Sequence, residues 1–597
     1  MIPNNFKSHH QLTICFAASK DTLRSDEYLA INIGFNNFLK ALLDEISSKG
    51  PQWSSKLILP HPDRLPDVFI NSIACGEVPV DIIALSGNNI SHLDKITKKR
   101  VNYPSSNNAN ELLDKKSYQL SCNLAVGYSD FVLIGCKPGG FSEEDVVVNS
   151  LISEAVRIGK PIITIESQDL VSLLLPQSVP DWEISILNGK PVSKSLFARY
   201  SQKISINEVA ILLLGNIIQS SNFSEDIKTI SNSFLMGRFV GKLDSFIVSL
   251  FSDFGLKGLA NQFRKNLFVE YYGVSSSELP EEHKKNHPIE EPNKFKVNFA
   301  LYDVRANYFS GCYRDINWIL YALSAFAVFA AIAGAISLGG LGNSWVWAVA
   351  ELLSILGVVF LVLLAKKHKY HERWLTNRFC AELIRYARVG LPFLLVPYSF
   401  RSITKYQTSG NNYENSSELC EMNRLFIDSG LPCSPKDKAY DPSNHFNELV
   451  FYACHILKDQ MLFHKKTCDR NHKTVHKLHK ISFYCFIFTL IAIFGHFVVH
   501  SELWLIFTAA LPAFAASIHG LVSQNEYHRI AQISNVTCSK LESILGVIEN
   551  HSIWQGLDNT KRFFQLQSIM QDAVEIMSNS IQSWQEINQG RATTLPS

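Results

Sequence analysis

The sequence lacks the motifs that would support an enzyme: it has no P-loop lysine motif, no Ser-His-Asp order and no cysteine set with zinc-binding spacing. It also has little net charge, +2 over 597 residues, which argues against a general nucleic-acid coat. Its twelve cysteines show no paired secretory spacing. We therefore expect free thiols in a cytoplasmic body, and neither a metal nor a resident cofactor.

Charge is nearly absent from four long apolar stretches of the chain. They are residues 316–338, 345–365, 481–499 and 503–522. At about 1.5 Å of rise per residue, roughly twenty apolar residues cross a hydrocarbon layer of ~30 Å. The sequence therefore predicts a multi-pass membrane protein with four transmembrane helices in two hairpins. Buried helical hairpins in a large soluble protein are the alternative, although core helices rarely stay apolar for so long.

Basic residues flank these stretches on one side only. The turn at 339–344 carries no charge, and the turn at 500–502 contains only His, Ser and Glu. The basic flanks are Arg305, Arg314, Lys366, Lys367, Lys369, Arg373, Lys465, Lys466, Arg470, Lys473, Lys477, Lys480 and Arg529. By the positive-inside rule both turns face away from the cytoplasm and both termini lie within it. Residues 1–11 are polar, so no cleaved signal is expected.

The N-terminal portion alternates apolar runs of strand length with helical patterns. The predicted strands are 12–17, 81–85, 131–135 and 161–165, and helices are predicted at 27–47 and 144–158. Continuous apolarity is typical of a parallel sheet covered on both faces. We therefore expect an α/β fold with a Rossmann-like parallel sheet, joined to an all-α membrane module with long cytoplasmic helices. Such sheets bind ligands at the carboxyl ends of their strands.

Composition divides the chain into five regions. They are an α/β domain at 1–220, a helical connector with a charged linker at 221–300, a first hairpin with its cytoplasmic helix at 301–400, a polar linker at 401–446, and a second hairpin with cytoplasmic helices at 447–597. Each hairpin exits into a Tyr-His pair, Tyr370-His371 or Tyr527-His528, and then into a helix. This order suggests an internal duplication.

A glycine loop follows the strand that ends at Gly135. It contains Gly139 and Gly140, and a helix is predicted to start near Ser142. Glycines let the backbone approach a ligand closely, and the free amides of a helix start attract phosphate. The loop therefore suggests a nucleotide site, with an ordinary strand-to-helix turn as the alternative. The residues expected to bind the ligand are Ala18, Ser19, Lys20, Arg24, Gly87, Lys137, Gly139, Gly140, Phe141, Ser142 and Glu143.

The same segment resembles the LOG-like Rossmann sensor family (SLOG). The matching residues are Ser129, Asp130, Pro138, Gly139, Gly140, Ala155, Gly159, Lys160 and Pro161. The resemblance implies that a nucleotide or short oligonucleotide is the ligand. Catalytic relatives keep a glutamate three residues before the helix alanine, where this chain has Ile152. We therefore expect binding without turnover. A membrane-tethered nucleotide hydrolase or deoxyribosyltransferase using Glu143, Glu144 or Glu154 is the alternative.

Three residues inside the predicted spans are candidates for a pore or gate. Glu351 and His496 are ionisable, and such groups usually face a bundle interior or water. Pro512 removes a backbone donor and should kink the fourth span. An interfacial glutamate and a helix-packing histidine are the alternatives for the first two. The histidines 472, 476 and 479 lie among lysines, so we expect a basic face attracted to anionic lipid rather than a metal site.

The second half resembles the SLATT family, in which two closely spaced membrane helices precede a cytoplasmic helix. The residues that carry this are the two hairpins and the helices that open at Tyr370 and Tyr527. The resemblance implies a pore-forming effector in a bacterial inner membrane. Four spans per chain are too few to enclose a wide pore easily, so we expect a homo-oligomer, with a tetramer as the guess. Antiphage effectors of the Hailong type, which work with a nucleotidyltransferase, would suit this layout. The ligand either opens or closes the channel, and a membrane scaffold without conduction is a further alternative.

Overall fold

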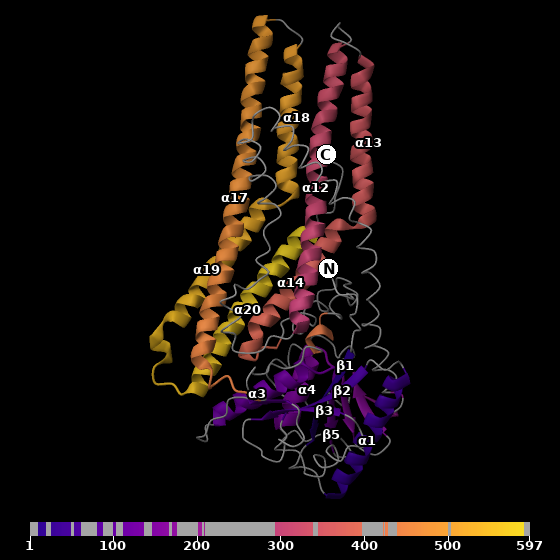
Figure 1. The fold of residues 1–597 in the computed structure, drawn as a ribbon, viewed down its shortest axis with the longest axis vertical. Coiled ribbons are helices and arrows are strands. Elements are labelled where there is room, and N and C mark those ends of the chain that lie inside the picture. Colours follow the sequence, from indigo (N-terminus) through magenta and orange to yellow (C-terminus); the bar gives the residue numbers. More distant parts are fainter. Residues whose placement is uncertain are drawn as a thin grey trace.

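A computed structural model describes most of the helical half and the sheet of the N-terminal half (Figure 1). The described residues are 10–18, 25–48, 53–60, 80–86, 99–102, 111–136, 146–165, 170–175, 201–205, 208, 293–337, 344–396, 422, 424–427, 439–499 and 503–589. The N-terminal half forms a mixed sheet, and the rest is mostly helical.

The sheet has the order β8-β7-β6-β5-β1-β2-β3-β4-β9. Its strands are β1 (His10–Ala18), β2 (Trp53–Leu59), β3 (Val80–Ser86), β4 (Lys99–Asn102), β5 (Phe131–Gly135), β6 (Ile162–Ile165), β7 (Leu170–Leu174), β8 (Gln202–Ser205) and β9 (Ala439–Tyr440). All neighbours from β6 to β9 are parallel, whereas β7 and β8 pair antiparallel at one edge. The four predicted strands lie at β1, β3, β5 and β6, but the sheet is mixed rather than wholly parallel.

Helices cover both faces of the central strands. On one face α1 (Ser25–Ser48) packs its aromatic rings against β1 and β5, with 4.4 Å between the centroids of Phe16 and Phe35. On the other face α3 (Glu111–Gly127) and α4 (Val146–Ile158) share a buried cluster with Cys15 and Val132. Because both faces are buried, every residue of β5 is apolar or glycine.

Among its described residues, the helical half contains four helices that are long and apolar enough to cross a membrane. Its elements are α12 (Asn293–Ser337), α13 (Ser344–His368), α14 (Tyr370–Gly390), η7 (Leu391–Phe393), α17 (Phe446–Val499), α18 (Leu503–Gln524), α19 (Tyr527–Glu549), η8 (His551–Trp554) and α20 (Asn559–Gln589). The apolar windows lie in α12, α13, α17 and the helix that begins near Leu503, and only 17–28% of each window is buried. Such exposure suits lipid and does not support buried core helices.

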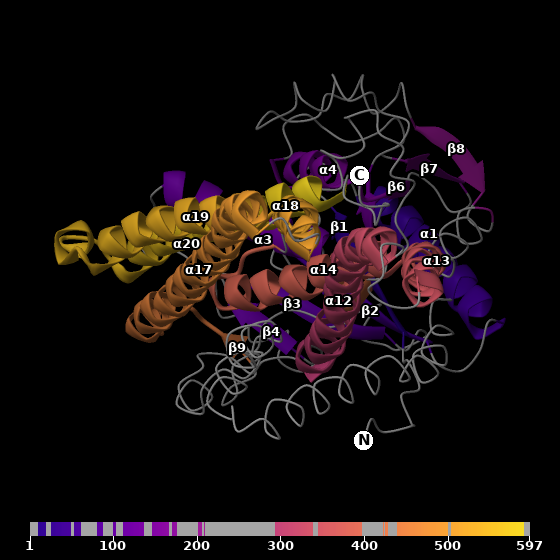
Figure 2. The ribbon, with the colours of Figure 1, turned by 90° about the horizontal axis from the view of Figure 1, so that it is seen from above.

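The four long helices pack in the order α13, α12, α18, α17 (Figures 1 and 2). The contact between α12 and α18 joins the two halves of this row. There Tyr321 lies against Gly520, and the buried amide of Asn317 donates to Asn525 at 3.5 Å. α13 and α17 therefore occupy opposite ends of the row.

Both halves of the row contain the same sharp bend. α13 turns into α14 at Lys369 (φ 49°), and α18 turns into α19 at Glu526 (φ 50°). These left-handed residues directly precede the two Tyr-His pairs. In each half the helix after the bend packs along the long first helix, α14 on α12 and α19 on α17. We call these two bends the elbows.

The sheet and the helical half share one hydrophobic core. Buried residues of the sheet, α3 and α4 belong to the same cluster as residues of α12, α14, α17, α19 and α20. Part of the predicted polar linker, residues 401–446, also belongs to this core. Phe426 is buried and packs edge-on against Phe295. Residues 439–440 form β9. Tyr440 of this strand donates to the Pro392 carbonyl at 2.7 Å.

Candidate functional site

The ends of β1 and β5 mark the predicted ligand edge. Ala18 pairs with Gly135 in the register of these parallel strands, so the loops that follow both strands begin side by side. A Cβ placed on Gly135 would lie 2.7 Å from the Ile31 side chain, so glycine permits the close approach of α1. Ala18 is buried. The other predicted ligand residues, Ser19, Lys20, Arg24, Gly87, Lys137 and Gly139 to Glu143, lie outside the described residues.

The topology gives this edge a further property. From β1 the chain continues to β2 on one side, whereas from β5 it continues to β6 on the other side. In open α/β sheets the strand ends beside such a reversal leave a crevice in which ligands bind. At this edge the structure describes Ala18 and Gly135 on neighbouring strands, and the predicted ligand residues that follow them lie outside the described ranges.

Five residues that carry the sensor resemblance lie at the opposite ends of the strands, before β5 and β6. Asp130 accepts a hydrogen bond from the Thr13 amide at 2.8 Å. It also forms an ion pair with Arg424 at 2.8 Å. Lys160 donates to the Ser129 carbonyl at 2.7 Å. Burial lowers the pKa of Lys160 to about 8, although nearby Asp130 opposes this. These residues hold strands and the 424–427 segment together.

The turn before β5 also contacts the helical half. A Cβ on Gly127 would lie 2.6 Å from the Val396 side chain, which follows η7. Together with Arg424 and Asp130, this contact places a junction with the helical half at the amino end of β5. The predicted ligand edge lies at the carboxyl end of the same strand.

Glu154, considered for the enzymatic alternative, lies in α4 and is buried. Its carboxylate accepts a hydrogen bond from Nε of Arg157 at 2.7 Å and forms an ion pair with the same guanidinium. Ile152 is part of the core. Both carboxylate oxygens of Glu154 are therefore engaged within its own helix.

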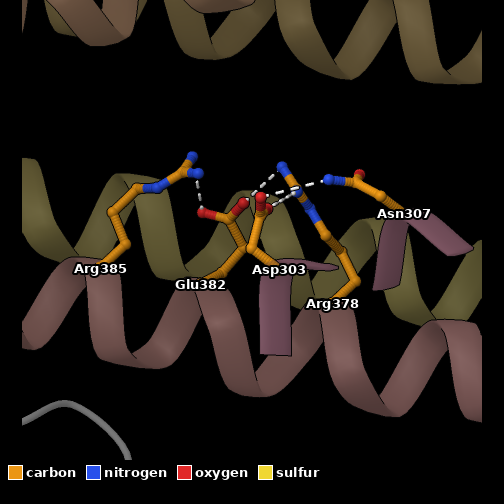
Figure 3. Close-up of polar contacts among 5 residues, drawn as sticks. All are labelled: Asp303, Asn307, Arg378, Glu382 and Arg385. Atoms are coloured by element: carbon orange, nitrogen blue, oxygen red, sulfur yellow. Dashed lines mark hydrogen bonds and ion pairs between the residues drawn. The ribbon is translucent and has the colours of Figure 1, made fainter. Parts of the chain in front are cut away.

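A buried ionic cluster joins α12 to α14 (Figure 3). Arg378 forms ion pairs with Asp303 at 3.1 Å and Glu382 at 2.6 Å, and Arg385 forms one with Glu382 at 3.2 Å. Asn307 also donates to Asp303. Burial by itself would raise the pKa of Glu382, but Arg385 and Arg378 outweigh it and lower that pKa. The carboxylate is thus ionised at neutral pH.

The third helix at this cluster is α17, through His464. Burial lowers the pKa of His464 to about 4, although Glu382 opposes the shift. The imidazole is therefore neutral at physiological pH. Its Nδ1 is buried and has no hydrogen-bond partner among the described residues. The sequence reasoning missed this cluster. The spacing of Arg378, Glu382 and Arg385 on one helix face was the available signal.

The predicted pore residues lie on three different helices. Glu351 is half-buried on α13, His496 is half-buried on α17, and Pro512 lies within α18, which continues through it. Because α13 and α17 are at opposite ends of the row, one chain does not bring Glu351 and His496 together.

Neither a metal centre nor a relative identifies the site. Within the described ranges, no three His, Cys, Asp or Glu side chains lie close enough together to share one metal ion. None of the cysteines in that part of the chain forms a disulfide. No family model, curated protein or solved structure matches the chain. The candidate site is therefore defined by its geometry.

Proposed function

We propose that the chain is a nucleotide-responsive membrane effector that conducts ions in bacterial antiphage defence. In this proposal a Rossmann-like domain binds a nucleotide or short oligonucleotide at the β1 and β5 ends. The two hairpins form the conducting module in the inner membrane, and ion leakage stops cell growth. One observation carries the proposal: a single buried core joins the sheet to α12 and α17, which continue without a break into apolar spans.

The ionic cluster suits the transmission of a signal. It links α12 to α14, and it also contacts α17 through His464. All of these residues lie outside the apolar spans, on the side of the sheet. A movement of the sheet would thus be transmitted to both α12 and α17 through this ionic cluster. Gating requires that ligand affinity differ between open and closed states, and either sign of that difference suits this arrangement.

The open row of spans favours an assembly of several copies. Two hairpins side by side do not enclose a channel, so the proposed pore is shared by a homo-oligomer, for which we propose a tetramer. Glu351, on an end helix, would then meet α17 of the next copy. A nucleotidyltransferase encoded nearby, as in Hailong-type systems, would supply the ligand.

Ion flux from liposomes tests the proposal. Purified protein is reconstituted with a potassium gradient, and flux is recorded with and without nucleotides extracted from infected and uninfected cells. We expect one extract to change the flux at least severalfold. Lys20→Ala with Arg24→Ala should abolish the response, whereas Lys40→Ala, at an exposed position of α1, should leave it unchanged.

The alternatives predict other outcomes. Absence of flux under every ligand condition would favour a scaffold. Release of free base from nucleotides, lost in Glu143→Gln, Glu144→Gln or Glu154→Gln, would establish a hydrolase or transferase. A response that survives the Lys20 and Arg24 substitutions would place the ligand elsewhere.

A further inference from the structure

Two pairs of histidines face each other between helices of the second half. His479 of α17 and His519 of α18 have ring centroids 5.2 Å apart. His472 of α17 and His528 of α19 have ring centroids 6.0 Å apart. His472 and His479 are seven residues apart, two helical turns, so they lie on the same face of α17. All four side chains are exposed.

The spacing of the rings suits a shared metal ion. A Zn²⁺ ion held ~2.0 Å from one nitrogen of each imidazole, at a tetrahedral angle, places the ring centroids about 5 Å apart. The pair of His479 and His519 meets this spacing without movement. The second pair is wider by less than an ångström and meets it with a small rotation of exposed side chains.

The surrounding charges restrict which ions can bind. Lys473, Lys480 and Arg529 directly follow three of the four histidines, and all are exposed cations. They repel a divalent cation, so binding must come from imidazole-to-metal bonds rather than from charge. Imidazole suits Zn²⁺ and Ni²⁺, whereas Mg²⁺ and Ca²⁺ require oxygen ligands.

We infer that each histidine pair is a binding site for a divalent transition-metal ion of the Zn²⁺ class. This differs from the basic lipid-facing surface expected at His472 and His479, because the sequence alone does not show that His528 and His519 lie opposite them. Two imidazoles supply the protein ligands of each ion, and water completes the coordination. His519 lies before the Glu526 elbow and His528 after it, whereas both partners lie on α17. Ions at both pairs therefore hold α18 and α19 against α17 and fix the bend. The sites do not depend on the proposed ion conduction.

Thermal unfolding of the full chain in detergent tests the inference. Unfolding is followed by tryptophan fluorescence with ZnCl₂, NiCl₂ or MgCl₂, because an ion that binds only the folded state raises Tm. We expect Zn²⁺ and Ni²⁺ to raise Tm and Mg²⁺ to leave it unchanged. His479→Gln and His472→Gln should each reduce the rise, and the double variant should abolish it. His476→Gln, an exposed histidine of the same helix, is the matched control.

Titration calorimetry with NiCl₂ then counts the ions. Two ions per wild-type chain, one in each single variant and none in the double variant would support both sites. A double variant that keeps the wild-type rise in Tm would overturn the inference, since the ion would then bind at cysteines or elsewhere. A wild-type protein whose Tm does not respond to Zn²⁺ or Ni²⁺ would overturn it as well.

Discussion

At the scale of single residues, buried charges hold the two halves of the chain together. Asp130 and Arg424 are 294 positions apart, yet their side chains pair with only 6% and 7% of their surface exposed. A buried charge that loses its partner keeps the full cost of its desolvation. The amino end of β5 should therefore be sensitive to changes in the 424–427 segment, far away in the sequence.

Arg424→Met tests this pair. The variant leaves the Asp130 carboxylate buried with the Thr13 amide as a remaining donor, and we expect unfolding to become easier by about 3–5 kcal/mol. Denaturant unfolding of the purified chain measures the change. Lys458→Met is the matched control, because it breaks an exposed pair with Glu549 and should have no measurable effect. Equal effects of the two substitutions would contradict the importance of burial.

Lys160 gives the folded protein a distinctive pH dependence. Its pKa falls from 10.5 to about 8 on burial, so between these pH values the unfolded chain binds more protons than the folded one. Stability must then rise with pH over this window, by up to about 3 kcal/mol in total. Lys160→Met should lack this rise, and Lys40→Met, at an exposed position, should keep it. The denaturant concentration at the unfolding midpoint, measured at pH 8 and pH 10, tests this. The same change with pH in wild type and Lys160→Met would refute the prediction.

At the scale of elements, the elbows explain how apolar spans become helices that run along the core. Lys369 and Glu526 adopt the left-handed conformation, which costs a residue with a Cβ about 1–2 kcal/mol. The same bend precedes the same Tyr-His pair in both halves, followed by a helix on the long first helix. Packing after the bend, such as Tyr313 against His371 and Trp374, offsets the backbone strain.

Lys369→Gly should stabilise the first elbow. Glycine adopts positive φ without the Cβ clash, so we expect a gain of about 1 kcal/mol in unfolding free energy. Lys369→Ala is the control, because it also removes the exposed pair with Glu372 but keeps the Cβ, and it should bring no gain. Thermal unfolding of the two variants side by side measures the difference. An equal Tm for both would mean that the elbow is not strained.

At the scale of the whole molecule, the two halves of the membrane row meet where α12 packs on α18. A Cβ on Gly520 would lie 2.5 Å from the ring of Tyr321, so the helices approach more closely than any larger residue allows. Asn317 and Asn525 add a buried polar contact at the same interface. This contact fixes the order of the spans, and the proposed assembly of several copies builds on that order.

Gly520→Ala should weaken this interface. The added methyl group must displace Tyr321, and overpacking of this kind costs about 1–3 kcal/mol. Gly546→Ala, in α19 with nothing within 4 Å of the added Cβ, should instead stabilise its helix by about 1 kcal/mol. Thermal unfolding in detergent compares the two variants. A stabilising Gly520→Ala would show that α12 and α18 are less closely packed than described.

Local patterns were enough for part of the fold and for little of the site. The strands at β1 and β5 followed from unbroken apolar runs, whereas the glycine loop predicted after Gly135 lies outside the described residues. No local pattern indicates that Arg424 pairs with Asp130, because Arg424 lies in a polar stretch. No pattern in the sequence indicated β9 either, because two residues are too few to show the alternation of apolar and polar side chains that marks a strand. Asp130 and Lys160 are part of the resemblance to the sensor family, but they lie at the strand ends opposite the predicted ligand edge.

The sequence by itself determined the four apolar spans, the buried central strands and the helices after each Tyr-His pair. These features depend on the length and period of apolar residues along the chain, which each segment carries alone. Only the tertiary structure decided the antiparallel edge of the sheet, the row order of the spans, the ionic cluster and the facing histidines. Each of these depends on which distant segments meet, and that is set by the packing of the whole chain rather than by any one segment.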